Sequence, residues 1–186
     1  GSEMCIRDRI YRLLRNYTCT FCAEKFGDFL HNSKGGLGMI AIGADHGGYR
    51  LKEEIKKYFE ENSIEYEDYG TYSEERTDYP IYAKKVAEAM VTGNADKGIL
   101  ICRSGYGMTV VANKFKGVRA ASVTSVAYAK AAKADDDINL LTLSGDNTTT
   151  KEAIEMINAW LETEFKGGRY KERLDMLEKI ENENMK

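Results

Sequence analysis

The sequence lacks the features that mark membrane-spanning, secreted and nucleic-acid-binding proteins. No apolar run approaches the roughly 18 residues that suggest a membrane span, and the N-terminus has no continuous apolar stretch followed by a small-residue cleavage site. Only 4 of the 186 residues are cysteine, which is too few for a disulfide scaffold. The formal net charge of -3 argues against a strongly basic surface. We therefore expect a soluble cytoplasmic protein with no nucleic-acid or membrane partner.

The remaining composition is that of one ordinary globular domain. Hydrophobic residues make up 42% of the chain and charged residues 31%, and the length suits one well-buried α/β domain. Residues 1–38 lack the regular pattern of strands and helices that begins at residue 39. We therefore expect a leader there that is non-native or flexible, and the domain over residues 39–186. The leader holds Cys19 and Cys22 in a C-x-x-C with His31 nearby. Half a zinc site or a redox pair is one interpretation, and an amphipathic or disordered leader is the other.

Short apolar strands alternate with helical patterns from residue 39 onward. This alternation predicts an α/β fold, a doubly wound five-stranded parallel sheet of order 2-1-3-4-5 with helices on both faces. An extra C-terminal helix carries an apolar stripe that needs a partner, either this chain or a second subunit. Strands are predicted over residues 39–45, 64–69, 98–102, 118–123 and 139–143. Helices are predicted over 47–62, 80–92, 125–134, 150–165 and 169–184, and a further helix after the third strand carries Met108, Val111 and Ala112 and ends near 116–117.

The segment Gly98–Lys114 combines features that favour a binding site. An apolar run predicts a buried strand ending at Cys102, and a glycine-punctuated turn and a helix follow. Backbone N–H groups of such a turn can bind an anion, and a cysteine beside them can act as a nucleophile or base. Ligands of doubly wound sheets bind beyond the C-terminal ends of the strands, at the switch point of the winding. We therefore expect Asp45 and His46, after the first strand, to lie beside this turn.

Several separated motifs occur in one order along the domain. They are GADHGGYRLK at 43–52, ERTDYP at 75–80, GILIC…SG.GM…ANK at 98–114, GVRAA at 117–121 and FKGGRYKERL at 165–174. With these motifs the chain resembles the ribose-5-phosphate isomerase B and galactose-6-phosphate isomerase family of sugar-phosphate isomerases over residues 39–186. The resemblance implies a dimer or tetramer with shared active sites. It also implies isomerisation of a phosphorylated pentose or hexose through an enediolate, without metal or other cofactor.

The resemblance assigns roles to the glycine turn, since enediolate chemistry needs a base, donors for an oxyanion and cations for the phosphate. It implies that Cys102 is the base and that Ser104, where a threonine is usual, assists ring opening or holds a sugar oxygen. Met108 stands where a branch of the family without the cysteine has a glutamate base. The substrate contacts implied in the turn are Arg103, Gly105, Tyr106, Gly107 and Met108.

Residues outside the turn also match the family's site. Asp45 and His46 match a pair that binds sugar hydroxyls and phosphate. Arg169 and Arg173 match arginines that reach the phosphate in the neighbouring subunit's site; spaced i, i+4, they share one helix face, and two guanidiniums suit a phosphate dianion. The alternatives are a structural histidine and a pair of surface arginines.

Some positions depart from the family pattern. Arg103 stands where many members have glycine, so its backbone would be strained if that glycine has a positive φ. Asp135 occupies the place of a ring-opening histidine in an H-N-D-x-N run that ends here at Asn139, and aspartate at its ordinary pKa is a poor acid near pH 7. We keep Asp135 as a candidate catalytic residue and Asn139 as a candidate substrate contact. Asp146 aligns with a phosphate-binding arginine and would repel phosphate unless Arg103 compensates.

The three adjacent aspartates at 135–137 raise a metal site as an alternative, because hard cations bind carboxylates. Consecutive residues at a helix end do not converge, however, so we expect no metal.

The leading hypothesis is a sugar-phosphate isomerase that converts ribose 5-phosphate to ribulose 5-phosphate with Cys102 as the base. One alternative is a catalytically impaired sugar-phosphate-binding homologue or a partner subunit of a heteromeric isomerase, motivated by Asp135 and Asp146. Another is a redox-sensing thiol at Cys102. The sequence does not choose between pentose and hexose phosphates, because pocket depth depends on Tyr72, Tyr79, Tyr106 and the partner subunit.

Overall fold

The computed structural model describes residues 38–185. The predicted leader with Cys19, Cys22 and His31 lies outside the described residues. Within the described part of the chain, no helix is long and apolar enough to cross a membrane.

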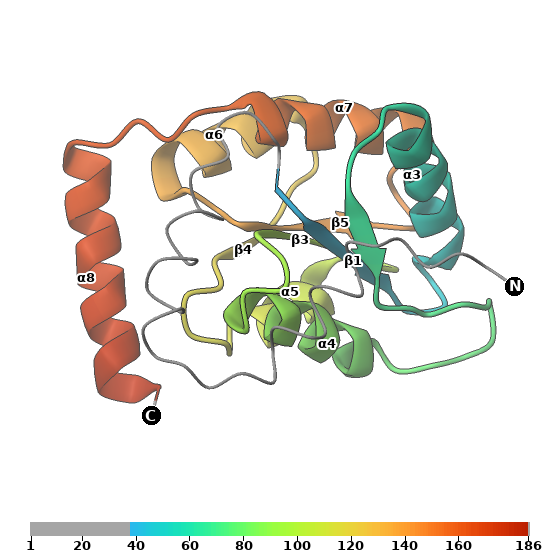
Figure 1. The fold of residues 1–186 in the computed structure, drawn as a ribbon, viewed down its shortest axis with the longest axis horizontal. Coiled ribbons are helices and arrows are strands. Elements are labelled where there is room, and N and C mark those ends of the chain that lie inside the picture. Colours follow the sequence, from blue (N-terminus) through green and yellow to red (C-terminus); the bar gives the residue numbers. More distant parts are fainter. Residues whose placement is uncertain (1–37, 186) are drawn as a thin grey trace, which may run out of the picture. The chain divides into compact units, whose positions relative to one another are not determined.

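One parallel sheet forms the centre of the described residues (Figure 1). Its order is β2-β1-β3-β5-β4. Strands β1, β3 and β5 are almost wholly buried, because helices cover both faces of the sheet. The predicted doubly wound α/β fold is therefore confirmed. The strands are β1 (Ile40–Ala44), β2 (Tyr66–Asp68), β3 (Lys97–Cys102), β4 (Ala120–Ser122) and β5 (Leu140–Ser144).

The predicted order of the last two strands is wrong. β5 pairs with β3, and β4 lies at the sheet edge beyond β5. The reason is burial: β5 has the sequence LLTLS with four buried residues, whereas β4 has three residues that are all half-buried. A longer apolar strand removes more surface from water in the middle of a sheet than at its edge. This order brings the turn after β5 beside the turn after β3.

The helices divide between the two faces by the direction of their crossovers (Figure 1). Right-handed connections toward one edge of a parallel sheet lie on one face, and those toward the other edge lie on the opposite face. The helices on one face are α3 (Tyr49–Glu61), α6 (Val126–Asp136) and α7 (Thr150–Glu162), and those on the other are α4 (Tyr79–Val91) and α5 (Tyr106–Ala112).

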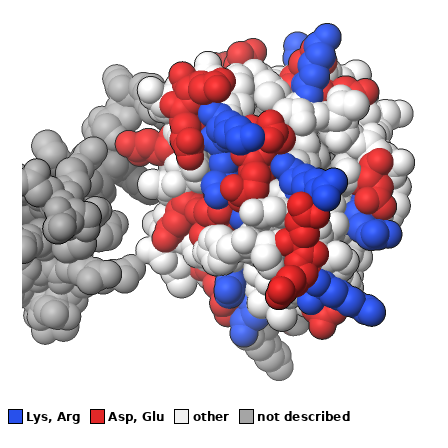
Figure 2. All heavy atoms as spheres, turned by 90° about the vertical axis from the view of Figure 1, so that its right-hand side faces the viewer, with Lys and Arg blue, Asp and Glu red and all other residues white. Residues whose placement is uncertain are grey.

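The core against α3, α6 and α7 is centred on large side chains such as Phe59 and Trp160. The Trp160 indole N–H donates to the Ile138 carbonyl at 3.0 Å, which satisfies its one polar atom in the interior. Outside this core, the α3 side of the molecule carries acidic and basic side chains in alternation (Figure 2). Pairs such as Lys57–Glu54 and Arg50–Glu74 contribute to that mixture, so this face is not a patch of one sign.

Helix α8 (Arg169–Asn184) lies apart from the two helical layers (Figure 1). It has no buried residue, and the side chains of Met176, Leu177 and Ile180 are exposed. Its contacts with the domain include a bond from the Gly117 N–H to the Glu181 carboxylate at 3.1 Å, and a groove of about 430 Å³ lies between it and the segment before β4. The apolar stripe predicted for this helix therefore remains largely uncovered by its own chain.

Candidate active site

The turns after β1 and β3 meet at the carboxyl edge of the sheet. The two strands are neighbours, and their crossovers leave in opposite directions, which makes this the switch point. A Cβ on Gly48 would lie 2.4 Å from the Ile101 carbonyl oxygen, and a Cβ on Gly145 would lie 2.3 Å from the Gly47 carbonyl oxygen. Glycine is required at both positions for the backbones to approach so closely. The predicted proximity of Asp45 and His46 to the Cys102 turn is confirmed.

Cys102 ends β3 with a buried side chain, 5% exposed. The Gly105 N–H donates to its Sγ at 3.2 Å. The chain turns back onto the sulfur because Gly105 has a φ of 81°, a conformation that residues with a Cβ avoid. An N–H aimed at the sulfur stabilises negative charge on it. The structure thus pairs the thiol with an oriented backbone donor.

Arg103 has an ordinary backbone conformation. Among the described residues, Ser63 and Asp137 are the non-glycine residues with positive φ, so the strain considered for Arg103 is absent. Its side chain is 71% exposed, and its guanidinium lies 4.0 Å from the Asp146 carboxylate. Its carbonyl accepts bonds from the Asp146 N–H at 3.2 Å and the Ser144 hydroxyl at 2.6 Å. The two departures from the family pattern, at 103 and 146, are therefore in one place and of opposite charge.

Asp45 is a buried carboxylate at the end of β1, 6% exposed. Its Oδ1 accepts the N–H groups of Gly47 at 2.9 Å and Gly48 at 3.2 Å. Burial raises the pKa of Asp45, and these two N–H groups, with His46 and Arg103, offset only part of that effect.

His46 is held by the backbone of Thr77, in the loop between β2 and α4. Its Nδ1 lies 3.0 Å from the Thr77 carbonyl oxygen and 3.3 Å from the Thr77 nitrogen. Because one ring nitrogen is engaged in this way, Nε2 is the atom that remains for a ligand. The role of Thr77 was missed by sequence reasoning, although its place in the ERTDYP motif was a signal.

The remaining turn residues differ in what they expose. Ser104 is exposed, with its Oγ 3.4 Å from the Tyr106 nitrogen. Tyr106 is also exposed, and the Tyr79 ring lies over Gly107, where a Cβ would be 2.8 Å from the ring. The Met108 side chain is wholly buried in the core. Only the backbone of Met108 is therefore able to make the predicted substrate contact.

Four predicted site residues lie at the opposite, amino edge of the sheet. Asp135 is near the end of α6, which runs back from the carboxyl edge, and Asn139 immediately precedes β5. Arg169 and Arg173 begin α8 after Lys166, whose N–H donates to the Ala134 carbonyl at 3.0 Å. The length of β3 separates the two edges by about 16 Å. One chain therefore does not bring these residues to Cys102.

The polar atoms of the amino edge are largely engaged within the chain. The Asn139 amide accepts from the Arg119 N–H and donates to the Gly117 carbonyl, both at 2.8 Å, and so braces the segment before β4. Asp135 accepts a bond from Lys166 at 2.5 Å.

Of the aspartates at 135–137, Asp135 and Asp137 pair with separate cations. Asp135 contacts Lys166, whereas Asp137 contacts Arg119 at 2.9 Å and Lys133. No group of three His, Cys, Asp or Glu side chains that could hold a metal ion occurs between residues 38 and 185.

Replacing Gly105 by alanine tests the turn at Cys102. At Gly105 a Cβ would add contacts of 3.0 Å to the Ser122 hydroxyl and 3.2 Å to Leu143 backbone atoms, on top of the strained φ. Gly93 has a similar φ of 74° in open space, so Gly93→Ala is the matched control. We expect Gly93→Ala to lower the free energy of unfolding by about 1 kcal/mol and Gly105→Ala by about 2 kcal/mol or more, measured by urea denaturation. Equal losses would contradict the crowding at Gly105.

Replacing Asp45 by asparagine tests the burial of its charge. A raised folded-state pKa means that the stability contributed by Asp45 is present below its unfolded pKa and is lost as pH rises through the folded value. The asparagine side chain keeps an oxygen for the two glycine N–H groups and carries no charge at any pH. We therefore expect Asp45→Asn to gain stability relative to the unmodified protein between about pH 3 and pH 7, in chemical denaturation at several pH values.

Glu74→Gln is the control for the pH series, because its stability relative to the unmodified protein should change in the opposite direction to that of Asp45→Asn. A hydrogen bond from Arg50 lowers the pKa of Glu74, so this variant should lose a little relative stability over the same pH range. A stability difference for Asp45→Asn that does not change with pH would contradict the buried charge.

Comparison with known proteins agrees with this geometry. Residues 40–177 match the family model described as Ribose/Galactose Isomerase. Ribose-5-phosphate isomerase B of Escherichia coli (strain K12) is 40% identical over 142 residues, which span 76% of this chain and 95% of that protein. Ribose-5-P isomerase B of Listeria innocua is 36% identical over 145 residues, spanning 78% of this chain and 98% of that protein.

Solved structures extend the similarity to the fold. A ribose 5-phosphate isomerase from Thermotoga maritima has a TM-score of 0.74 at 40% identity and covers 76% of this chain and 98% of its own. Ribose-5-phosphate isomerase B from Mycoplasma genitalium with bound ribulose-5-phosphate has a TM-score of 0.74 at 36% identity, covering 78% of this chain and 97% of its own. With the family model, the relatives and the fold in agreement, this chain belongs to the Ribose/Galactose Isomerase family.

Proposed function

We propose that the protein is an aldose–ketose isomerase that interconverts ribose 5-phosphate and ribulose 5-phosphate. The observation that carries the proposal is the meeting of the buried Cys102 thiol and its donor turn with Asp45 and His46 at the switch point of the sheet. Relatives named ribose-5-phosphate isomerase B support this substrate, as does the Mycoplasma genitalium structure with ribulose-5-phosphate.

Cys102 serves as the base in this proposal. Its thiolate removes the proton from C2 of the open-chain aldose, and the electron pair moves through C1 to the carbonyl oxygen to form an enediolate. Backbone N–H groups of the turn from Ser104 to Met108 stabilise the charge on that oxygen. The oxygen atoms at C1 and C2 exchange a proton, and the Cys102 thiol returns its proton to C1, which yields the ketose.

Asp45, His46 and Ser104 hold the sugar. In this proposal the Asp45 carboxylate and the His46 Nε2 contact the sugar from the turn after β1, and the exposed Ser104 hydroxyl contacts it from the turn after β3. Hydrogen bonds from these groups to sugar hydroxyls orient C2 toward the sulfur and assist ring opening.

A second copy of the chain completes the site in this proposal. The amino edge, which the length of β3 separates from Cys102 by about 16 Å, is where Arg169, Arg173, Asp135 and Asn139 lie. The side chains of Met176, Leu177 and Ile180 on α8 are exposed. A homodimer or tetramer that covers these apolar side chains of α8 would bring the arginines of one subunit to the carboxyl edge of the sheet in another. Arg103 faces Asp146 at 4.0 Å, so the negative charge at 146 is balanced beside the incoming phosphate.

Removal of the Cys102 sulfur tests the role of the base. We expect Cys102→Ala to lower kcat for ribose 5-phosphate by about 10²-fold or more, because no other group in the proposed mechanism removes the proton from C2 of the sugar. The conversion is measured by the formation of ribulose 5-phosphate, and circular dichroism serves as the control for folding. An unchanged kcat would exclude Cys102 as the base.

The same assay distinguishes the binding homologue from the enzyme. If the unmodified protein is stabilised by ribose 5-phosphate in a thermal-shift measurement but gives no turnover, a sugar-phosphate-binding subunit replaces the proposed isomerase. If it shows neither effect, both functions are contradicted.

Mixing two inactive variants tests the shared site. Cys102→Ala disables the thiol of a site, and the double variant Arg169→Ala/Arg173→Ala disables the phosphate contacts that its partner supplies. After co-refolding in equal amounts, half of the dimers are mixed and each holds one intact site, so about a quarter of the activity of the unmodified protein should return. Activity that stays at the level of the separate variants would contradict the shared site. The arginines would then act in the same subunit as the thiol, or would not belong to the site.

A further inference from the structure

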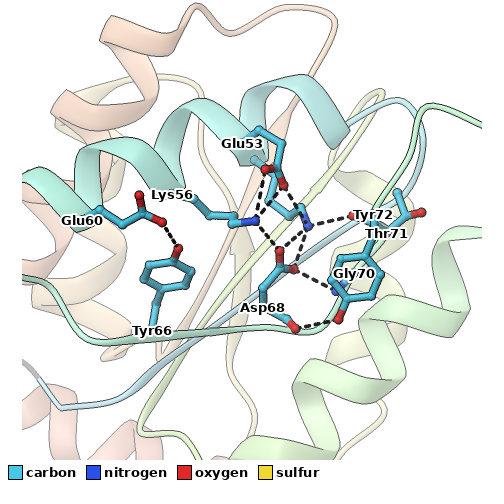
Figure 3. Close-up of polar contacts among 9 residues, drawn as sticks. Glu53, Lys56, Glu60, Tyr66, Asp68, Gly70, Thr71 and Tyr72 are labelled. Atoms are coloured by element: carbon cyan, nitrogen blue, oxygen red, sulfur yellow. Dashed lines mark hydrogen bonds and ion pairs between the residues drawn. The ribbon is translucent and has the colours of Figure 1, made fainter. Parts of the chain in front are cut away.

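Lys52 is a wholly buried lysine on the sheet-facing side of α3, 0% exposed. Its ammonium donates to both carboxylate oxygens of Asp68, at 2.6 and 2.7 Å, and to the Thr71 carbonyl at 2.7 Å. Its partners Asp68 and Thr71 lie where β2 ends and the loop to α4 begins (Figure 3). The ammonium is thus fully paired, and it is out of reach of any substrate.

Stability alone does not account for this lysine. Desolvation of a buried ion pair offsets much of its attraction, so an apolar side chain of similar volume is often as stable or more so. Asp68 also has a second cation, because Lys56 lies 2.7 Å from its carboxylate and bridges to Glu53 (Figure 3). Burial acts to raise the pKa of Asp68, but hydrogen bonds from Lys52, Lys56 and the Gly70 N–H lower it overall. The bond to Thr71 is what Lys52 provides and Lys56 does not.

Thr71 begins the loop that holds the active-site histidine. Its N–H donates to the Ala44 carbonyl at 2.7 Å, directly before Asp45. The loop continues to Thr77, whose backbone contacts the His46 ring and whose hydroxyl lies 3.0 Å from the Tyr82 hydroxyl. Tyr79 follows, and its ring lies over Gly107 in the turn after β3. One segment therefore connects the buried ammonium to both turns of the site.

We propose that Lys52 is a positioning residue of the active site, which holds the loop at Thr71 and through Thr77 sets the orientation of the His46 ring. The balance between the two tautomers of that ring then depends on how closely its Nδ1 lies to the Thr77 carbonyl and to the Thr77 N–H. The charge is placed in the interior because an ammonium has three donors on a long stem and can bond a carboxylate and a backbone carbonyl together. The catalytic consequence rests on the isomerase activity proposed above, whereas the effect on the His46 ring does not.

The test compares Lys52→Met with Lys56→Met. Each variant removes one positive charge next to Asp68, but only the first removes the bond to Thr71. Both are made in a His31→Gln background, which leaves His46 as the single imidazole of the chain. Nitrogen NMR at pH 8.5, where a histidine of ordinary pKa is neutral, reports the tautomer of the ring. The kcat and KM for ribose 5-phosphate are measured on the same samples.

We expect Lys56→Met to keep the ratio of His46 tautomers found in the background protein and a kcat within about 2-fold of it. Lys52→Met should change that ratio and lower kcat by about 10-fold or more, because small displacements of a catalytic group are costly. If Lys52→Met does not fold, Lys52→Arg takes its place; it keeps the charge but moves the donors, and the same changes are expected.

An unchanged tautomer ratio in the Lys52 variant overturns the proposal, whatever happens to kcat. A changed ratio with unchanged kcat and KM overturns the catalytic part of it. Similar effects of the two methionine variants also overturn it, since charge rather than the Thr71 bond would then be the cause. If the background protein shows no turnover, the proposed function fails, and the NMR comparison still decides whether Lys52 fixes the His46 ring.

Discussion

The pairing of β1 with β3 is the contact on which the arrangement of the site depends. The crossovers from these two neighbouring strands leave in opposite directions, so no connection covers the space between their carboxyl ends. Asp45, His46 and Cys102 enter that space from two strands that are more than fifty residues apart in sequence but are hydrogen-bonded side by side. Glycines at 48 and 145 allow the turns to touch, and Gly105 turns the backbone onto the sulfur. The contacts at Gly48 and Gly145 depend on the parallel pairing of the strands, because each joins turns or strands that are far apart in the sequence.

The charged residues at the carboxyl edge of the sheet differ from those that the family pattern implies. The arginine expected near residue 146 is absent, and an arginine at 103 stands where glycine is common. Because β5 lies next to β3, the two positions are adjacent, and Arg103 and Asp146 face one another at 4.0 Å. The pair is exposed and adds little to stability. The guanidinium places a positive charge beside the Asp146 carboxylate, which offsets its negative charge locally.

The two edges of the sheet hold two halves of the predicted site. The carboxyl edge has the thiol, the buried aspartate and the oriented histidine, and the amino edge has Arg169 and Arg173 at the start of an apolar-striped helix. The shared site proposed above would account for the way α8 projects from the domain instead of packing into a helical layer. In that proposal, the network of Lys52, Asp68 and Thr71 orders the half-site that each subunit contributes.

Local sequence patterns were sufficient to predict the elements and which turns meet at the carboxyl edge. Periodicity and glycine punctuation located the strands and helices, and the position of Cys102 and His46 after buried strands was enough to place them together, because parallel strands end at one edge. The folded chain was needed for everything that depends on competition between distant segments. The order of β4 and β5 followed from which strand buried more apolar surface, the ordinary backbone of Arg103 from the conformation of its turn, and the separation of Asp135 and Arg169 from Cys102 from the direction of the helices. The orientation of His46 by Thr77 and the burial of Lys52 arise from contacts across 31 and 19 residues of chain, which no local pattern records.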